Sequence, residues 1–289
     1  MNRLLCFGFG FTATALARRL VRADWAIAGT STTAEGAARL AGLGAEGLVF
    51  DGASPGVGVA AALAEATHVL NSIPPGNGAD PVLLRHAMDI AASPTIRWIG
   101  YLSTVGIYGD HQGGPVDETT PPSPISERGR KRLAAEQAWL YLGQRSGKQV
   151  QVFRLPGIYG PGRSALDTVR AGKARRLVKP GQVFNRIHVD DIAAALALAM
   201  EGRGHHSVYN ISDDEPCPPQ DVVTHACRLL GVEPPPEAAF DAATLSPMAA
   251  SFYGESKRVS SARAKADLGW RPRYPNYREG LAALLASGA

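Results

Sequence analysis

The strongest constraint on the fold is that short apolar segments alternate with segments of helical periodicity over the first 155 residues. The apolar runs predict strands at 4–7, 25–30, 48–50, 68–73, 97–102 and 150–155, with helices at 12–23, 37–43, 59–63, 81–91 and about 126–145. Strands that alternate with helices form right-handed crossovers and a parallel sheet covered on both faces. We therefore expect an α/β protein with a doubly wound parallel Rossmann sheet.

Beyond Leu155 the pattern loosens, because Gly, Pro and Arg interrupt segments of irregular length. A helix is expected after Val189, with Asp190 or Asp191 as its N-cap, and a strand at 208–211. Ser260 or Ser261 is expected to cap a short helix that Gly269 ends.

The domain division follows from this change of pattern. Residues 1–155 plus 188–212 are predicted to form the dinucleotide-binding domain. Residues 156–187 plus 213–289 are predicted to form a small substrate lobe over the C-terminal edge of the sheet.

The composition is that of a globular protein, with 45% apolar and 19% charged residues among 289. The 30 basic and 26 acidic residues give a net charge of only +4, and the basic residues are scattered along the chain. A basic cluster at 170–179 has no interleaved aromatic residues. We read it as a solvated loop or a clamp for an anion, and we expect no nucleic-acid partner.

The cysteines and the hydropathy pattern indicate the compartment. Cys6, Cys217 and Cys227 are too few and too unpatterned for a disulfide scaffold. No apolar run reaches the roughly 18 to 20 residues that span a bilayer. We expect a cytoplasmic protein with no membrane partner and no metal site.

The segment Gly8-Phe9-Gly10-Phe11-Thr12-Ala13 lies between the first strand and the first helix. Its first glycine permits a tight turn, its second admits a close diphosphate, and Ala13 lets the helix pack on the strand. The free amides of the helix N-terminus would then face the phosphates. The alternative is a glycine-rich turn with no ligand.

The end of the second strand bears on the choice of dinucleotide. NAD enzymes usually carry Asp or Glu there, but this chain has Thr30, Ser31 and Thr32. Hydroxyls tolerate a 2′-phosphate, and Arg39 is the nearest cation, so NADP is favoured over NAD. Asp51 follows the third strand, where it would accept a bond from the adenine amine or form an ordinary turn.

Several segments resemble those of the extended short-chain dehydrogenases, the NAD-dependent epimerase/dehydratase family. The resemblance covers nearly the whole chain, in family order. It rests on Ser103-Thr104-Val105-Gly106-Ile107-Tyr108-Gly109, on 154–162 (RLPGIYGPG), on 186–193 (RIHVDDIA), on 209–211 (YNI) and on 268–272 (LGWRP). Such a resemblance is strong evidence for the fold and weak evidence for the reaction.

The resemblance implies a Ser or Thr, a Tyr and a Lys at the reacting end of the cofactor. Thr104 keeps the hydroxyl position; it would bond the reacting oxygen or satisfy backbone at the strand end. The Tyr-x-x-x-Lys pair is absent: alignment on Leu133 and Glu136 places Arg128 at the tyrosine and Arg132 at the lysine. A shift by one residue would pair Glu127 with Lys131 but break the Leu and Glu matches.

Arginine cannot replace the tyrosine, because its guanidinium neither donates nor accepts a proton at neutral pH. Arg128 could bind a substrate anion, and Arg132 could hold a ribose hydroxyl or pair with Glu136 on a solvated helix. The chain thus resembles an atypical branch of nucleoside-diphosphate-sugar epimerases that lack the tyrosine.

The expected site is completed by residues at other strand ends. Ser72 and Gly157 are expected at the cofactor. Ser103, Tyr159, Arg163, Arg186 and His188 are expected at the substrate. The missing proton carrier would be Tyr108, Tyr159, His188 or water, although His188 is more often structural in its segment.

Two functions fit these observations. One is an NAD(P)-dependent oxidoreductase or epimerase-like enzyme that acts on a small, anionic or nucleotide-sugar-like molecule. The other is a catalytically silent NADP(H)-binding sensor or regulatory protein. The resemblance also makes a homodimer plausible, through the helices that begin near Pro81 and Ser126.

Overall fold

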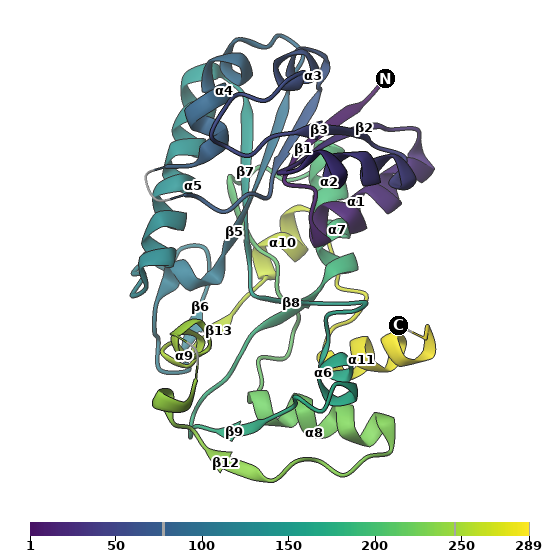
Figure 1. The fold of residues 1–289 in the computed structure, drawn as a ribbon. Coiled ribbons are helices and arrows are strands. Elements are labelled where there is room, and N and C mark those ends of the chain that lie inside the picture. The colour runs from purple at the N-terminus through teal and green to yellow at the C-terminus, as the bar shows by residue number, and fades with distance from the viewer. Residues whose placement is uncertain (77–78, 246, 289) are drawn as a thin grey trace.

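The computed structural model describes residues 1–76, 79–245 and 247–288. Its larger strands and helices follow the predicted alternation (Figure 1). The strands are β1 (Arg3–Phe7), β2 (Ala26–Ser31), β3 (Glu46–Val49), β4 (His68–Asn71), β5 (Trp98–Thr104), β6 (Pro115–Val116), β7 (Gln149–Leu155), β8 (Gly157–Tyr159), β9 (Arg176–Val178), β10 (Arg186–His188), β11 (Val208–Asn210), β12 (Glu237–Ala239) and β13 (Arg258–Val259).

The helices differ from the prediction mainly at their ends, and α1 and α2 each continue into a 3-10 helix. The α-helices are α1 (Phe11–Leu20), α2 (Ala34–Ala38), α3 (Val59–Glu65), α4 (Pro81–Ala92), α5 (Glu127–Ser146), α6 (Ala165–Arg170), α7 (Val189–Met200), α8 (Pro219–Leu230), α9 (Pro247–Tyr253), α10 (Ala262–Asp267) and α11 (Tyr277–Ala286). The 3-10 helices are η1 (Val21–Ala23), η2 (Arg39–Leu43), η3 (Val105–Tyr108) and η4 (Ala242–Thr244).

The central sheet has seven strands in the order β11-β7-β5-β4-β1-β2-β3, and all its strand pairs are parallel. The chain runs outward in one direction from β1 through β2 and β3, and in the other from β4 through β5, β7 and β11. This is the doubly wound α/β architecture that the alternation predicts. The direction reverses between β1 and β4, and ligands of such sheets bind in the crevice at that point.

Helices cover both faces of the sheet and form two apolar cores. On one face α1 and α7 pack against each other, with Leu16 and Leu196 among the buried residues. On the other face α3, α4 and α5 cover Leu5, Val69 and Val152. Such near-continuous apolar strands are typical of a parallel sheet buried on both sides.

The N-cap of α7 differs from the prediction. His188 is the N-cap, and its Nδ1 accepts the Asp190 amide at 3.2 Å, whereas Asp190 and Asp191 lie in the first turn. The prediction of an aspartate cap was therefore wrong. A ring nitrogen takes the place of the usual carboxylate, and the two acidic residues still favour the positive end of the helix dipole.

The C-terminal half places further helices and short strand pairs beyond the C-terminal edge of the sheet (Figure 1). Helices α6, α8 and α11 enclose a separate apolar core that includes Leu166, Ala226 and Leu281. By contrast, Leu268 and Trp270 near α10 pack into the core of α1 and α7. The proposed division at 155, 188 and 212 remains a prediction.

Among the described residues, no helix combines the length and the hydropathy needed to cross a bilayer.

Candidate functional site

The glycine turn after β1 is held by the two strands that flank β1. The Gly8 amide donates to Thr30 Oγ1 at 2.9 Å, and Ser72 Oγ donates to the Gly8 carbonyl at 2.7 Å. Gly8 has φ of 78°, and a Cβ there would lie 2.8 Å from Ile73 Cγ1. Glycine is thus required both by the left-handed backbone and by the close approach of the segment that follows β4.

The N-terminus of α1 faces open space. Gly10 is its N-cap, and no side chain caps the helix within the described chain. A Cβ added to Gly10 would meet no protein atom within 4 Å, and its φ of −94° suits any residue. Neither strain nor packing therefore requires glycine at this position. Free helix amides with no side chain in front of them suit a diphosphate, so the turn fits a dinucleotide.

The residues expected at the cofactor ribose divide into two groups. Thr30 is buried, and its hydroxyl is occupied by the Gly8 amide, so it positions the turn rather than meeting a ribose. Ser31 is half-buried and Thr32 is exposed. Asp51 is exposed, and its Oδ1 accepts the amides of Ala53 and Ser54, which hold the pKa of its carboxyl below the usual value.

At the end of β5 the two hydroxyl residues face different partners. Ser103 is buried and donates to Glu136 Oε1 on α5, so the geometry does not bring it to the cleft as a substrate contact. Thr104 is half-buried, and its Oγ1 accepts the Gly106 amide at 3.1 Å as the cap of η3. Thr104 therefore satisfies backbone, one of its two expected roles, at the edge where ligands of this fold bind.

Tyr108 is not placed to carry a proton to a substrate. Its side chain is fully buried; its hydroxyl donates to Asn210 Oδ1 at 2.8 Å and accepts from Arg154 at 2.9 Å. Burial also raises its pKa. These contacts connect η3, β7 and β11, so Tyr108 has a structural position.

The two α5 arginines at the Tyr and Lys positions, Arg128 and Arg132, have different partners. Arg128 is exposed and lies over the Phe252 ring, with 5.0 Å from Cζ to the ring centroid. Arg132 is half-buried and donates to the Leu102 carbonyl at 2.9 Å and the Tyr101 hydroxyl at 3.2 Å. The Arg132 guanidinium thus joins α5 to the end of β5.

The alternative pairing of Arg132 with Glu136 does not occur. Glu136 is buried and accepts from the Arg154 guanidinium at 2.8 Å. Glu136 also accepts a hydrogen bond from the Ser103 hydroxyl. Ser103, Glu136 and Arg154 thus form one buried polar cluster that holds α5 against β5 and β7.

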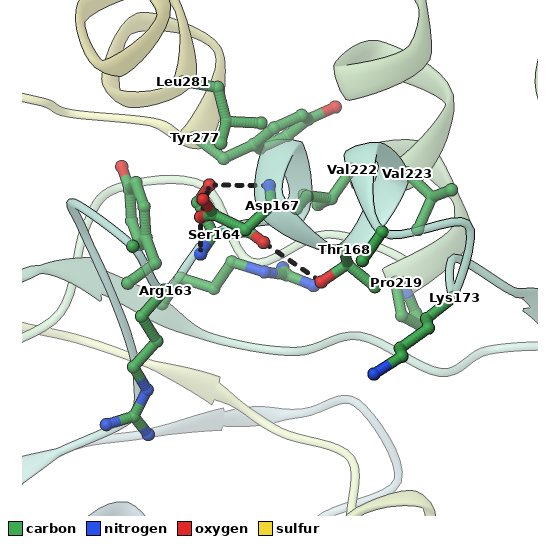
Figure 2. Close-up of a pocket in the computed structure, with 15 residues that line it drawn as sticks. Arg163, Ser164, Asp167, Thr168, Lys173, Pro219, Val222, Val223, Tyr277 and Leu281 are labelled. Atoms are coloured by element: carbon green, nitrogen blue, oxygen red, sulfur yellow. Dashed lines mark hydrogen bonds between the residues drawn. The ribbon is translucent and has the colours of Figure 1, made fainter. Parts of the chain in front are cut away.

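Three of the predicted substrate residues line one cavity of about 520 Å³ in the C-terminal lobe: Tyr159, Arg163 and Arg186. In Figure 2, Tyr277 and Leu281 lie in the upper part of the view, and the Arg163 and Lys173 side chains extend into the lower part. The cavity therefore combines an apolar wall with cationic side chains.

Arg163 connects this cavity with the glycine turn. Its Cζ lies 5.7 Å from the centroid of the Phe11 ring, in the first turn of α1. The Tyr159 hydroxyl is buried and has no hydrogen-bond partner among the described residues. Burial raises its pKa, so Tyr159 remains a neutral phenol.

His188 and Gly157 lie on the strand pair β8–β10 that leads into α7. His188 is buried, caps α7 through Nδ1, and has its pKa lowered chiefly by burial. It does not line the substrate cavity. Gly157 is exposed and pairs with Arg186 in the register of the two strands.

Asp213 and Lys257 are among the buried ionisable groups that the sequence did not mark. Asp213 is buried, has no side-chain hydrogen-bond partner in the described parts of the chain, and has its pKa raised to about 8 by burial. Lys257 is also buried, and its Nζ lies 2.6 Å from Glu255 Oε2. Both residues occur in polar segments without periodicity, so the local sequence gives no sign that they are buried. Their burial results from residues that are distant in the sequence.

A family model supplies the identification. The model described as the NAD dependent epimerase/dehydratase family matches residues 78–212. The chain belongs to this family. The matched segment includes α5 with Arg128 and Arg132, η3, and the strands β5, β7 and β11.

Similarity to three other proteins extends over nearly the whole chain. A conserved protein of unknown function from Silicibacter pomeroyi DSS is 47% identical, covers 100% of this chain and 99% of its own, and superposes with a TM-score of 0.90. Protein YeeZ of Escherichia coli K12 is 29% identical over 96% of this chain and 97% of its own length. The dTDP-glucose 4,6-dehydratase of Bacillus anthracis, solved with NAD, shares the fold at 16% identity, with 99% and 96% coverage and a TM-score of 0.78.

Proposed function

We propose that this protein is an NAD(P)-dependent oxidoreductase or epimerase-like enzyme that acts on a small, anionic or nucleotide-sugar-like substrate. The observation that carries the proposal is the open, uncapped N-terminus of α1 at Gly10. It lies beside the point where the strand order reverses, and the fit of its amides to a diphosphate supports dinucleotide binding. Bound nicotinamide would supply or accept the hydride.

NADP is proposed as the preferred dinucleotide. The second strand ends in half-buried Ser31 and exposed Thr32, with no carboxylate to repel a 2′-phosphate. Arg39, exposed on the following 3-10 helix, is the nearest cation in the sequence. Calorimetry should give a lower Kd for NADP⁺ than for NAD⁺, and Arg39→Ala should narrow that difference.

The lobe cavity is proposed to hold the non-reacting part of the substrate. Its apolar wall of Val222, Tyr277 and Leu281 suits a flat ring or an aliphatic group. The cations of Arg163, Lys173 and Arg186 suit a phosphate or carboxylate. The dTDP-glucose 4,6-dehydratase of Bacillus anthracis, which shares this fold, was solved in complex with NAD. A nucleotide-sugar-like substrate is consistent with this likeness.

At the reacting end, Thr104 would polarise the reacting oxygen, and Arg128 would hold a substrate anion in place of the family tyrosine. Arg132 would have a positioning role, because its hydrogen bond to the Leu102 carbonyl holds α5 against the end of β5.

The test is to incubate the protein with NADPH and a broad panel of carbonyl compounds and to follow absorbance at 340 nm. Cofactor oxidation with any member of the panel supports the enzyme. Failure of the folded protein to bind NADP(H) or NAD(H) in calorimetry would remove the proposal altogether.

A second candidate is a sensor that binds NADP(H) without turnover. It is favoured by the arginines at positions 128 and 132 and by the buried, fully bonded Tyr108. Micromolar cofactor binding with no oxidation across the whole panel would favour this candidate.

A further inference from the structure

The region that approaches the end of β5 carries an ion pair that none of the family motifs contains. Lys257 Nζ lies 2.6 Å from Glu255 Oε2, and the exposed fractions of the two side chains are 6% and 13%. Both residues precede β13, which pairs with β6 after the turn that follows η3. The pair is therefore attached to the same loop system as the end of β5.

Gly106, two residues after Thr104, shows where the ion pair lies relative to the end of β5. A Cβ added to Gly106 would lie 3.4 Å from Thr104 Oγ1 and 3.9 Å from Glu255 Oε2. The carboxylate and the threonine hydroxyl thus border one point at the C-terminal end of β5. Reacting groups in parallel sheets of this kind lie at that end.

The backbone around the pair is held rigidly from both sides. The Ser256 amide donates to Asp110 Oδ1 at 2.8 Å, and the Gly113 amide donates to the Ser256 carbonyl at 2.9 Å. Asn185 Nδ2 donates to the Lys257 carbonyl at 2.9 Å. Such backbone anchoring keeps two charged side chains in one place, as a catalytic group requires.

Stability alone does not account for the pair. A buried ion pair contributes little net stability, because desolvation of both charges offsets their attraction. Glu255 Oε2 and Thr104 Oγ1 lie within 4 Å of the same point at Gly106, at the edge of the sheet where ligands of this fold bind. Tyr108 is hydrogen-bonded in the core, and His188 caps α7, so neither is placed to carry a proton at this end of the sheet.

We propose that Lys257 is the proton donor of the site and that Glu255 is the residue that positions it. The proposal rests on the proposed NAD(P)-dependent function. Lys257 Nζ would give a proton to the substrate carbonyl oxygen. Bound reduced nicotinamide would supply the hydride to the carbonyl carbon, so that the carbonyl is reduced to an alcohol. The amine left neutral regains a proton from water, and the reverse reaction returns the alcohol proton to Nζ.

The first test needs no substrate. An NAD analogue with a bromoacetyl group on its pyridine ring alkylates a nearby amine with loss of bromide. At pH 9, peptide mapping should find the label on Lys257, and excess NADP⁺ should suppress it. If the analogue binds but labels another side chain or none, this inference fails alone; if no dinucleotide binds, the proposed function fails with it.

The second test uses turnover on a substrate from the carbonyl panel. Lys257→Met and Lys257→Arg should each lower kcat by about 100-fold or more, the usual effect of losing a general acid. The Kd for NADPH should stay within about twofold, and ethylammonium should partly restore Lys257→Ala. Retained activity in Lys257→Arg would overturn the proposal, because a guanidinium holds an anion but transfers no proton.

The matched control is Lys265→Met, which removes a lysine paired with Asp214 on the surface of α10. It should leave kcat unchanged. Glu255→Gln should lower kcat less than the lysine variants, because it leaves the proton donor in place but less firmly held.

Discussion

Gly10 separates the requirements of folding from those of ligand binding. Its backbone is extended and no protein atom lies within 4 Å of an added Cβ, so Gly10→Ala should change the free energy of unfolding by less than about 0.5 kcal/mol. The new methyl group would stand where the diphosphate approaches, so the Kd for NADP⁺ should rise at least about tenfold. Denaturant unfolding and calorimetry on the same preparation check both values.

Gly8→Ala is the contrasting variant in the same turn. Its φ of 78° and the 2.8 Å approach of Ile73 make the folded state strained, so stability should fall by about 1–3 kcal/mol. Equal losses of stability in the Gly8 and Gly10 variants would contradict the assignment of Gly10 to the ligand.

Asp213 should make the protein less stable as the pH rises. Burial raises the pKa of its carboxyl to about 8, against about 3.9 in an unfolded chain. Between these values the folded state holds a proton that the unfolded state has released, so the free energy of unfolding falls as pH increases from about 4 to about 8.

Replacing Asp213 with Asn should flatten that dependence and raise stability at pH 8. Asp214→Asn, which alters the neighbouring exposed carboxylate, is the matched control. It should leave most of the slope in place, because burial raises the pKa of Asp213 more than the charge of Asp214 does. Denaturant titrations at several pH values measure the difference. A slope that survives Asp213→Asn would assign it to other groups, of which Asp191, with a pKa raised to about 6, is the first.

The glycine turn could be predicted from sequence because its requirements are local: φ at Gly8 and space at Gly10. The positions of Ser103 and Tyr108 could not. Their partners, Glu136, Arg154 and Asn210, come from other elements, and only the folded sheet brings them together.

At the level of elements, α5 is the helix on which the reacting end depends. Its Glu136 forms a buried ion pair with Arg154, and truncating one partner leaves the other charge buried and unpaired. Glu136→Ala should therefore lower the free energy of unfolding by about 3–5 kcal/mol. Glu127→Ala, on the exposed start of the same helix, should cost no more than about 0.5 kcal/mol. Similar losses in both would show that the buried pair is not what fastens α5.

The helices and strands of the first 155 residues were predictable because apolar periodicity reports directly on the face that each element buries. Their ends were less so. His188 caps α7 in place of the predicted aspartate, since a histidine nitrogen accepts a helix amide when the chain enters from an adjacent strand. The short pairs β9–β12 and β6–β13 had no signal, because strands of two or three residues carry no period.

For the whole molecule, the parallel sheet followed from the handedness of its crossovers, whereas the lobe cavity did not follow from any pattern. Its lining comes from β8, β10, α6, α8 and α11 and the loops on either side of α6, and these segments are spread over 159–281. Tyr159, Arg163 and Arg186 were predicted as substrate residues, but only the tertiary structure shows that they line one cavity.

The exposed surface of α4 and α5 supports the proposed homodimer. Leu84 and Met88, one turn apart on α4, are 62% and 79% exposed, and Tyr141 on the adjacent α5 is 63% exposed. Exposed large apolar side chains on neighbouring helices are typical of an interface. In a symmetric dimer each charge added to this face would be buried twice.

Leu84→Asp combined with Met88→Asp should therefore convert a dimer into a monomer in sedimentation velocity at micromolar concentration, without unfolding the protein. Val232→Asp is the control, because Val232 is 47% exposed directly after α8, at the other end of the molecule from α4 (Figure 1). A wild-type protein that sediments as a monomer would contradict the proposal, as would a dimer that survives the double substitution. Because the charges are added on the outer face of α4, whose buried residues include Val82 and Ile90, cofactor affinity should remain that of the wild type.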